Sequence, residues 1–319
     1  MRWLVPLLAI ALSACAGVER LAIPPVQEES PVWADHTPGS VERVDHGAWS
    51  AFLAAYLKTD ADGVNRLDYG RVSDVDRAAL DGYLDRLSGT DIVRLDRDEQ
   101  LAFWINLYNA QTVAVVLDSY PVRSIRSIKP GGAFSIGPWN AKVVTVKARP
   151  LSLHDIEHGI IRAFWKDPRI HYALNCAAVG CPNLAPTVYS GDGLESSLAE
   201  AERAYVNDPR GVWFDPKGRL HLSKIYLWYR EDFGATQTDV LRGLAEIAQS
   251  EKTRERLARA PWVFAYIYDW TLNDTATVGA QASDPEKPAL EVRMNGVLST
   301  EIKRRVGGGV RERQRTGAD

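Results

Sequence analysis

The sequence predicts an α+β fold, a single globular domain built from a mixed sheet and helices. Hydrophobic residues make up 45% of the 319 positions and include 10 Trp and 12 Tyr, which is enough for a substantial core. Segments with helical and strand patterns follow one another without the strict strand–helix alternation of a parallel α/β sheet. A chain of this length can fold as one large domain. We place the domain at residues 46–275.

Helices are expected where apolar residues recur at the helical period, and strands where short β-rich runs end in turn residues. The predicted helices are residues 48–57, 74–87, 98–119, a segment after Ser152, 194–206 and 225–233. The predicted strands are residues 170–176, a hairpin of 212–214 with 220–222, and a late strand at 263–270.

The helix at 98–119 is apolar on nearly all sides, so it should be buried. Asp96 and Glu99 are expected to cap the start of this helix, and Pro121 marks the end of the helix. Asn106 and Asn109 lie three residues apart on this helix and therefore occupy neighbouring positions. A buried amide must find hydrogen-bond partners or destabilise the fold.

The segment after Ser152 predicts a helix, because Asp155 stands three residues later as a capping partner. His154, Glu157 and His158 lie beside its apolar stripe. The apolar run at 170–176 then predicts a buried strand, and residues 180–183 predict the turn that follows it.

The first residues carry a targeting pattern. Arg2 precedes an apolar run over residues 3–12, which is too short to cross a bilayer, and Leu12-Ser-Ala-Cys15 follows. This pattern resembles a bacterial lipoprotein signal. The resemblance implies that residues 1–14 are a signal peptide and that Cys15 carries a diacylglyceryl group and a fatty acyl group such as palmitate. Several acyl chains would hold the protein stably at a membrane.

The resemblance also implies a location in the cell envelope. Ala16, rather than Asp, follows the cysteine, which predicts the periplasmic side of the outer membrane if the host has one. Residues 15–45, with Pro24, Pro25, Pro31 and Pro38, are expected to be a lipidated, flexible spacer.

The last segment and the overall charge also limit the function. Residues 276–319 contain no aromatic residue and include Gly307-Gly-Gly309, so this tail is predicted to be mostly disordered.

The net charge of −3 offers no electrostatic case for nucleic-acid binding. The expected partners are a membrane, through the anchor, and an unknown envelope substrate or protein. No cofactor is expected.

A series of blocks stands at residues 101–110, 151–158, 168–176 continued by Gly180-Cys-Pro182, and 222–229 with Asp232-Phe233, and residues 268–273 close the domain. Together these blocks resemble the domain of unknown function 547 family. The match lies in the order and spacing of these blocks. The family carries no settled activity, so the resemblance implies a domain type and no reaction.

The leading hypothesis for function is a cysteine-dependent hydrolase or acyl transferase acting on an amide-type bond. Cys181 would be the nucleophile, His171 the base, and Asn109 or Asn106 the group that orients the imidazole. His171 precedes the cysteine, the reverse of the papain order, but such triads are defined by geometry rather than by chain order.

Two alternatives remain open. Cys176 and Cys181 could form a structural disulfide in an oxidising compartment, which would leave a non-catalytic envelope binding or scaffold module. His154-Asp-Ile-Glu157-His158 could instead bind zinc, since histidines four residues apart share a helix face and Glu157 could activate water. A third ligand would then be needed, from His171 or a cysteine.

Overall fold

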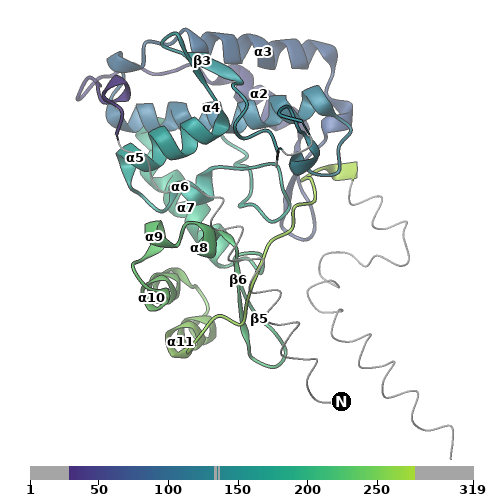
Figure 1. Cartoon of the computed structure of the whole chain (residues 1–319), viewed down its shortest axis with the longest axis vertical. Coiled ribbons are helices and arrows are strands. Elements are labelled where there is room, and N and C mark those ends of the chain that lie inside the picture. Colours follow the sequence, from purple (N-terminus) through teal and green to yellow (C-terminus); the bar gives the residue numbers. More distant parts are fainter. Residues whose placement is uncertain (1–28, 133–134, 136, 277–319) are drawn as a thin grey trace, which may run out of the picture.

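The computed structural model describes residues 29–132, 135 and 137–276, and it confirms the predicted α+β class. Helices α2 (Gly47–Tyr56), α3 (Asp74–Ser88) and α4 (Arg97–Ser119) lie together at one end of the molecule (Figure 1). Helices α10 (Gln237–Ile247) and α11 (Glu251–Arg259) lie at the other end. Between them lie α5 (Arg162–Trp165), α6 (Ile170–Ala173) and α7 (Leu194–Val206).

Most predicted helices are confirmed. Helix α7 has the predicted bounds, and α2, α3 and α4 differ from prediction by one or two residues. The predicted helix at 225–233 is divided into α8 (Ile225–Trp228) and α9 (Arg230–Phe233). Short 3-10 helices join the larger elements: η1 (Pro31–Trp33), η2 (Tyr69–Arg71), η3 (Ile92–Arg94), η4 (Ile125–Ser127) and η6 (Gly191–Gly193).

The strands form small sheets. Strands β1 (Leu57–Thr59) and β2 (Asn65–Leu67) are antiparallel, as are β3 (Val144–Val146) and β4 (Arg149–Leu151). The third sheet pairs β5 (Val212–Phe214) antiparallel to β6 (Leu220–Ser223), and β6 parallel to β7 (Ala265–Ile267). The predicted hairpin is therefore confirmed, and the predicted late strand is present but limited to residues 265–267. Strands β1 to β4 have three residues each, too few to show an alternating pattern in the sequence.

Two segments differ from prediction between residues 152 and 176. The predicted strand at 170–176 begins instead with the short helix α6, and the chain becomes extended only at Leu174. A short buried apolar run has no periodicity that separates a strand from a helical turn. The segment after Ser152 is a π-helix, η5 (Asp155–Ile161), continued by α5. Ser152 and Asp155 exchange hydrogen bonds of 2.7 and 3.1 Å, as the predicted cap requires.

Helix α4 is buried along most of its length, as predicted. Asp96 caps it by accepting from the Asp98 amide at 3.1 Å. Glu99 does not complete the capping pair. Its carboxylate accepts from the backbone amides of Val44 and Gly191, at 2.8 and 2.7 Å, so it holds two distant segments against the start of the helix.

The buried side chains form two clusters. The first surrounds α4 and includes residues of α2, α3 and η5. The second includes residues of α7, β6, α8 and α10. Trp270 packs against both clusters. The region between α4 and α10 is therefore where the two cores meet, and the candidate site lies there.

The predicted spacer is shorter than expected, because residues 31–45 pack on the domain. The Trp33 ring is 7% exposed and meets Trp104 edge to face with 5.4 Å between ring centroids. The Thr37 amide donates to the Leu95 carbonyl at 2.9 Å. Pro31, which suggested a linker, begins η1 instead. Residues 1–28, with Cys15, and the predicted tail from residue 277 lie outside the described residues.

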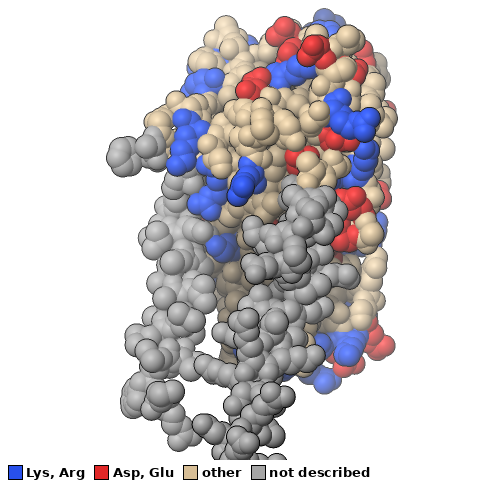
Figure 2. Space-filling view, turned by 90° about the vertical axis from the view of Figure 1, so that its right-hand side faces the viewer, with Lys and Arg blue, Asp and Glu red and all other residues tan. Residues whose placement is uncertain are grey.

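The surface carries both signs of charge. Figure 2 shows Lys and Arg side chains interspersed with Asp and Glu over one face, in keeping with the small net charge of −3. In the described ranges, every helix is too short or too polar to serve as a bilayer span.

The packing of Trp33 leads to a stability test. We expect Trp33→Ala to lower the free energy of unfolding by about 3–5 kcal/mol, because it removes a buried aromatic side chain. Val41→Ala in the same segment is the control, since Val41 is 85% exposed and should change stability by less than about 0.5 kcal/mol. Urea unfolding of both variants measures the difference. Equal, small effects would mean that residues 31–45 are a spacer after all.

Candidate functional site

Cys176 and Cys181 form a disulfide, with 6.4 Å between their Cα atoms. The Tyr268 hydroxyl lies 2.9 Å from each sulfur, and the Cys176 amide donates to the Cys181 Sγ at 3.0 Å. Cys181 is 3% exposed. In this structure, therefore, Cys181, the predicted nucleophile, is not a free thiol.

His171, the predicted base, lies on α6 and faces a different group. Its Nε2 is 2.6 Å from the Asp232 Oδ2 on α9, and its ring stacks on Tyr229 with 4.0 Å between centroids. Among the hydrogen bonds of the described residues, none joins His171 to a cysteine. The structure thus brings His171 to a carboxylate and not to the sulfur that the hydrolase hypothesis assigned to it.

Asn106 and Asn109 both bind backbone. The Asn106 side chain donates to the Tyr189 carbonyl at 2.8 Å and accepts from the amide of the same residue at 3.1 Å. Asn109 donates to the Ala173 carbonyl at 2.9 Å and accepts from the Asn175 amide at 2.8 Å. Both side chains are buried and satisfied in this way. Asn109 thereby fixes the stretch that leads into Cys176, and neither amide orients His171.

A buried arginine connects the groups around His171. Arg162, on α5, donates through Nε and Nη2 to the two oxygens of Asp232, at 2.7 and 2.9 Å. Its Nη1 lies 2.9 Å from the His158 Nδ1, and the guanidinium stands 5.1 Å from the centre of the Tyr229 ring. The Arg162 side chain is 0% exposed. This two-pronged pairing is the geometry in which arginine binds a carboxylate most strongly.

Glu157 extends the network toward α4. The Tyr108 hydroxyl donates to its Oε2 at 3.1 Å, and the Tyr229 side chain is a second hydrogen-bond partner. The rings of His154 and His158 lie 4.5 Å apart. We call Tyr108, Glu157, His158, Arg162, His171, Tyr229 and Asp232 the buried polar network. It joins α4, η5, α5, α6 and α9 at the meeting point of the two cores.

The environment sets the charges of this network. Burial alone would raise the pKa of Asp232, but hydrogen bonds from His171 and Arg162 hold that pKa well below its usual range. Burial opposes ionisation of Glu157 as well, yet the pKa of this carboxyl is lowered by His158 and His171. Burial lowers the pKa of His158 to about 4. At neutral pH the network therefore holds two carboxylates, a guanidinium and a neutral His158.

The contacts do not favour the zinc hypothesis for His154, Glu157 and His158. Glu157 is occupied by tyrosine hydroxyls, and the Nδ1 of His158 faces the Arg162 guanidinium. A fixed cation beside a ligand opposes binding of a second cation. Over the described parts of the chain, no three His, Cys, Asp or Glu side chains are grouped as a metal site would need.

Sequence reasoning missed Arg162, Tyr229, Asp232 and Tyr268. Arg162 follows His158 by four residues on a helix with a buried apolar stripe, and a charge at such a position signals a buried partner. Asp232 stands in an aromatic-rich segment whose composition is typical of core packing. Its pairing with Arg162 spans 70 residues, so no local spacing could reveal it.

Comparison with known proteins adds one finding. Residues 92–206 match the family model described as protein of unknown function, DUF547. The matched stretch runs from η3 to the end of α7 and contains both cysteines, His171 and Arg162. Asp232 and Tyr268, which complete the contacts of these residues, lie beyond it. Searches of curated proteins and of solved structures gave no match.

The Arg162–Asp232 pair can be tested by removing one charge. We expect Asp232→Asn to lower the free energy of unfolding by about 3–5 kcal/mol, because it removes the carboxylate that accepts both prongs of the buried guanidinium and leaves the longer, 3.6 Å ion pair with partly exposed Glu231. Asp85→Asn, at an exposed position, is the matched control and should cost less than about 0.5 kcal/mol. Chemical denaturation of both variants gives the comparison. A small effect at Asp232 would mean that the pair contributes nothing to stability.

Buried neutral His158 predicts a pH dependence. A histidine in the unfolded chain titrates near pH 6.5, whereas the pKa of folded His158 is about 4. Between these two pH values the unfolded chain therefore binds more protons than the folded protein. The contribution of neutral His158 to the free energy of unfolding is complete above about pH 6.5 and is lost as the pH falls toward 4. Its size is about 3 kcal/mol. Buried His46 has the same lowered pKa of about 4 and adds a similar decline.

His158→Gln, which keeps an acceptor for Arg162, should roughly halve the loss of unfolding free energy between pH 7 and pH 4.5. Urea unfolding at a series of pH values measures this loss, with His46→Gln as the parallel variant. If His158→Gln retains the full decline of the wild type, the folded histidine is not held neutral.

Proposed function

We propose that this protein is a lipid-anchored, non-catalytic binding or scaffold module of the cell envelope, with a structural disulfide between Cys176 and Cys181. The observation that carries the proposal is the disulfide itself, since it occupies the candidate nucleophile Cys181. A nucleophilic cysteine must be a thiolate with a base in reach. Here the candidate base, His171, is hydrogen-bonded to Asp232.

The surroundings of the disulfide support a structural role. Arg210 donates through Nη1 to the carbonyls of Val179 and Cys181, both at 3.1 Å. The Tyr205 hydroxyl donates to the Gly180 carbonyl at 2.7 Å. The loop between the cysteines is thus held by side chains from α7 and from the turn before β5. Closing so short a loop contributes about 2 kcal/mol in the chain-entropy model.

The proposed location follows from the first residues and agrees with this chemistry. The Leu12-Ser-Ala-Cys15 pattern supports lipidation of Cys15, and Ala16 supports placement on the periplasmic side of the outer membrane if the host has one. Disulfides persist in oxidising compartments such as the periplasm. The disulfide therefore supports a location in an oxidising compartment outside the cytoplasm.

The other two functions stay predictions. A Cys181 hydrolase would require reduction of the disulfide and movement of His171 away from Asp232. A zinc site at His154 and His158 would require His158 to bind metal beside Arg162. Neither requirement is supported by the described contacts.

Thiol labelling separates the structural role from the catalytic one. In protein purified from the envelope and denatured without reductant, we expect no alkylation of Cys176 or Cys181, and alkylation of both after reduction. Intact-mass spectrometry reads out the result. Recovery of both residues as free thiols from the native source would contradict the proposal.

Single substitutions give a second comparison. If the disulfide is structural, Cys176→Ser and Cys181→Ser should each lower the free energy of unfolding, by a similar amount of about 2 kcal/mol. A nucleophile would instead make Cys181 alone react with thiol-directed probes in the folded, reduced protein. Cell fractionation of Cys15→Ser tests the anchor separately, and we expect this variant to shift from the membrane fraction toward the soluble fraction.

A further inference from the structure

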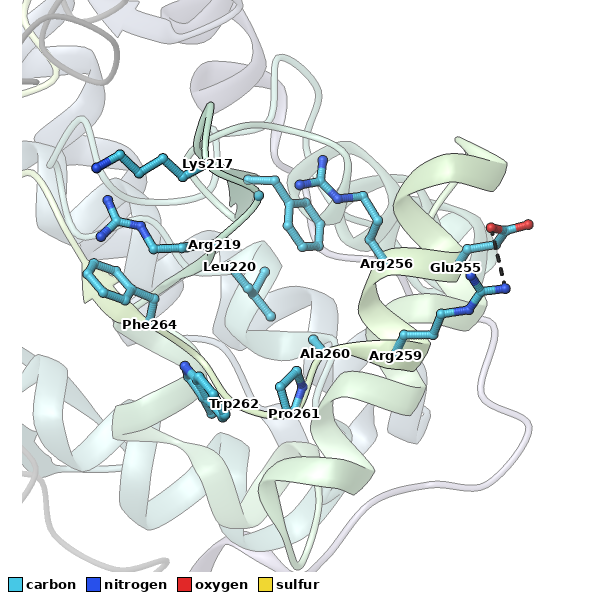
Figure 3. Close-up of a pocket in the computed structure, with 12 residues that line it drawn as sticks. Lys217, Arg219, Leu220, Glu255, Arg256, Arg259, Ala260, Pro261, Trp262 and Phe264 are labelled. Carbon is cyan, nitrogen blue, oxygen red and sulfur yellow. Dashed lines mark ion pairs between the residues drawn. The ribbon is translucent and has the colours of Figure 1, made fainter. Parts of the chain in front are cut away.

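A cavity among the described residues lies outside the buried polar network, between the β5–β6 hairpin and the end of α11 (Figure 3). Its volume is about 360 Å³. Four cationic side chains line it, against one acidic side chain, Glu255. The cations are Lys217, Arg219, Arg256 and Arg259. We call these residues with Trp262 and Phe264 the hairpin pocket.

The cations of the hairpin pocket are held in place by aromatic rings. The Arg219 guanidinium lies 3.8 Å from the centre of the Phe264 ring, and that of Arg256 lies 4.0 Å from the centre of Phe214. Stacking of this kind fixes a guanidinium while leaving the N–H groups at its edge able to donate. The pocket therefore presents ordered cations beside apolar surface.

Part of this positive charge has no partner. Asp215 pairs with Arg219 at 2.5 Å, and Glu255 pairs with Arg259 at 3.8 Å across a turn of α11. Within the described residues, no hydrogen bond or ion pair engages the side-chain ammonium of Lys217 or the guanidinium of Arg256. An anion at the pocket would supply the missing counter-charge.

Large apolar side chains project from the same place. Trp262 is 65% exposed and Phe264 is 46% exposed, and among the described residues they are the two aromatic members of the exposed large hydrophobic set. Figure 3 shows Lys217, Arg219 and Arg256 along one side and Trp262 and Pro261 on the other. Exposed aromatic surface beside cations marks an interaction site.

The exposure of these side chains identifies the kind of ligand. An enclosed small-molecule site buries most of its ligand, whereas here the Trp262 and Arg259 side chains are 65% and 80% exposed. Tryptophan is enriched at the membrane–water interface, and lysine and arginine are attracted to anionic lipid headgroups. We infer that the hairpin pocket is a membrane-contact site that binds the phosphate headgroups of anionic phospholipids through Lys217 and Arg256 while Trp262 enters the interface.

This contact would give the domain a fixed orientation on the membrane. A lipid anchor at Cys15 alone would not fix which face of the domain meets the membrane, and a second contact on the surface of the domain would. The inference rests on the proposed function in one respect, because the anchor would keep a membrane within reach. The test therefore uses the full chain with Cys15→Ser. Because this variant lacks the proposed anchor, its binding to vesicles reports on the pocket, and the fractionation experiment above reports on the anchor.

Flotation with lipid vesicles tests the inference. Two chains are compared: Cys15→Ser alone, and Cys15→Ser with Lys217→Gln/Arg256→Gln. The partition coefficient of each chain is measured on phosphatidylglycerol-containing vesicles and on phosphatidylcholine vesicles. Each cation near an anionic surface contributes about 1 kcal/mol, so we expect about a 30-fold loss of binding to the anionic vesicles. Binding to phosphatidylcholine vesicles should not change. Added salt should abolish the difference between the variants.

The matched control is Lys129→Gln/Arg149→Gln, which removes one lysine and one arginine at exposed positions elsewhere. We expect it to change binding less than threefold. Trp262→Ala should weaken binding without changing the salt dependence, and thermal unfolding confirms that each variant is folded. Equal losses in the pocket and control variants, or no loss in the pocket variant, would overturn the inference.

Discussion

The pairing of Arg162 with Asp232 is the constraint on which the arrangement of this domain depends. The guanidinium is fully buried and meets both oxygens of the carboxylate. Removing two charges from water costs several kcal/mol for each ion, and this cost is recovered only when geometry and additional hydrogen bonds are good. His171 and His158 supply those bonds. Because the partners come from α5 and α9, the pair can form only when the two cores are correctly docked.

The same network explains why His171 is not placed as a catalytic base. Its Nε2 is used by Asp232, and its ring is stacked on Tyr229. The disulfide lies one short segment further along the chain, where Asn109 holds the backbone of residues 173 and 175. Histidine and cysteine are thus close in sequence but serve different parts of the packing. A His–Cys spacing in a sequence is therefore insufficient evidence for a dyad.

The sequence predicted well what depends on local pattern. The bounds of α7, the burial of α4 and the cap formed by Ser152 and Asp155 follow from periodicity and short-range chemistry. It failed where the deciding interaction is long-range. Arg162 and Asp232 are 70 residues apart, and Trp33 is fixed by Trp104 across a similar separation. The strand expected at 170–176 failed for another reason, since a buried apolar run fits a short helix equally well.

Native-state hydrogen exchange of Asp232→Asn tests most directly whether the buried polar network fastens the two cores together. If it does, amides of α9 and α10 should lose protection in the variant, while those of α3, at the far end of the first core, keep the protection of the wild type. Unchanged protection in α9 and α10 would contradict the account, because the two cores would then be held together without the network.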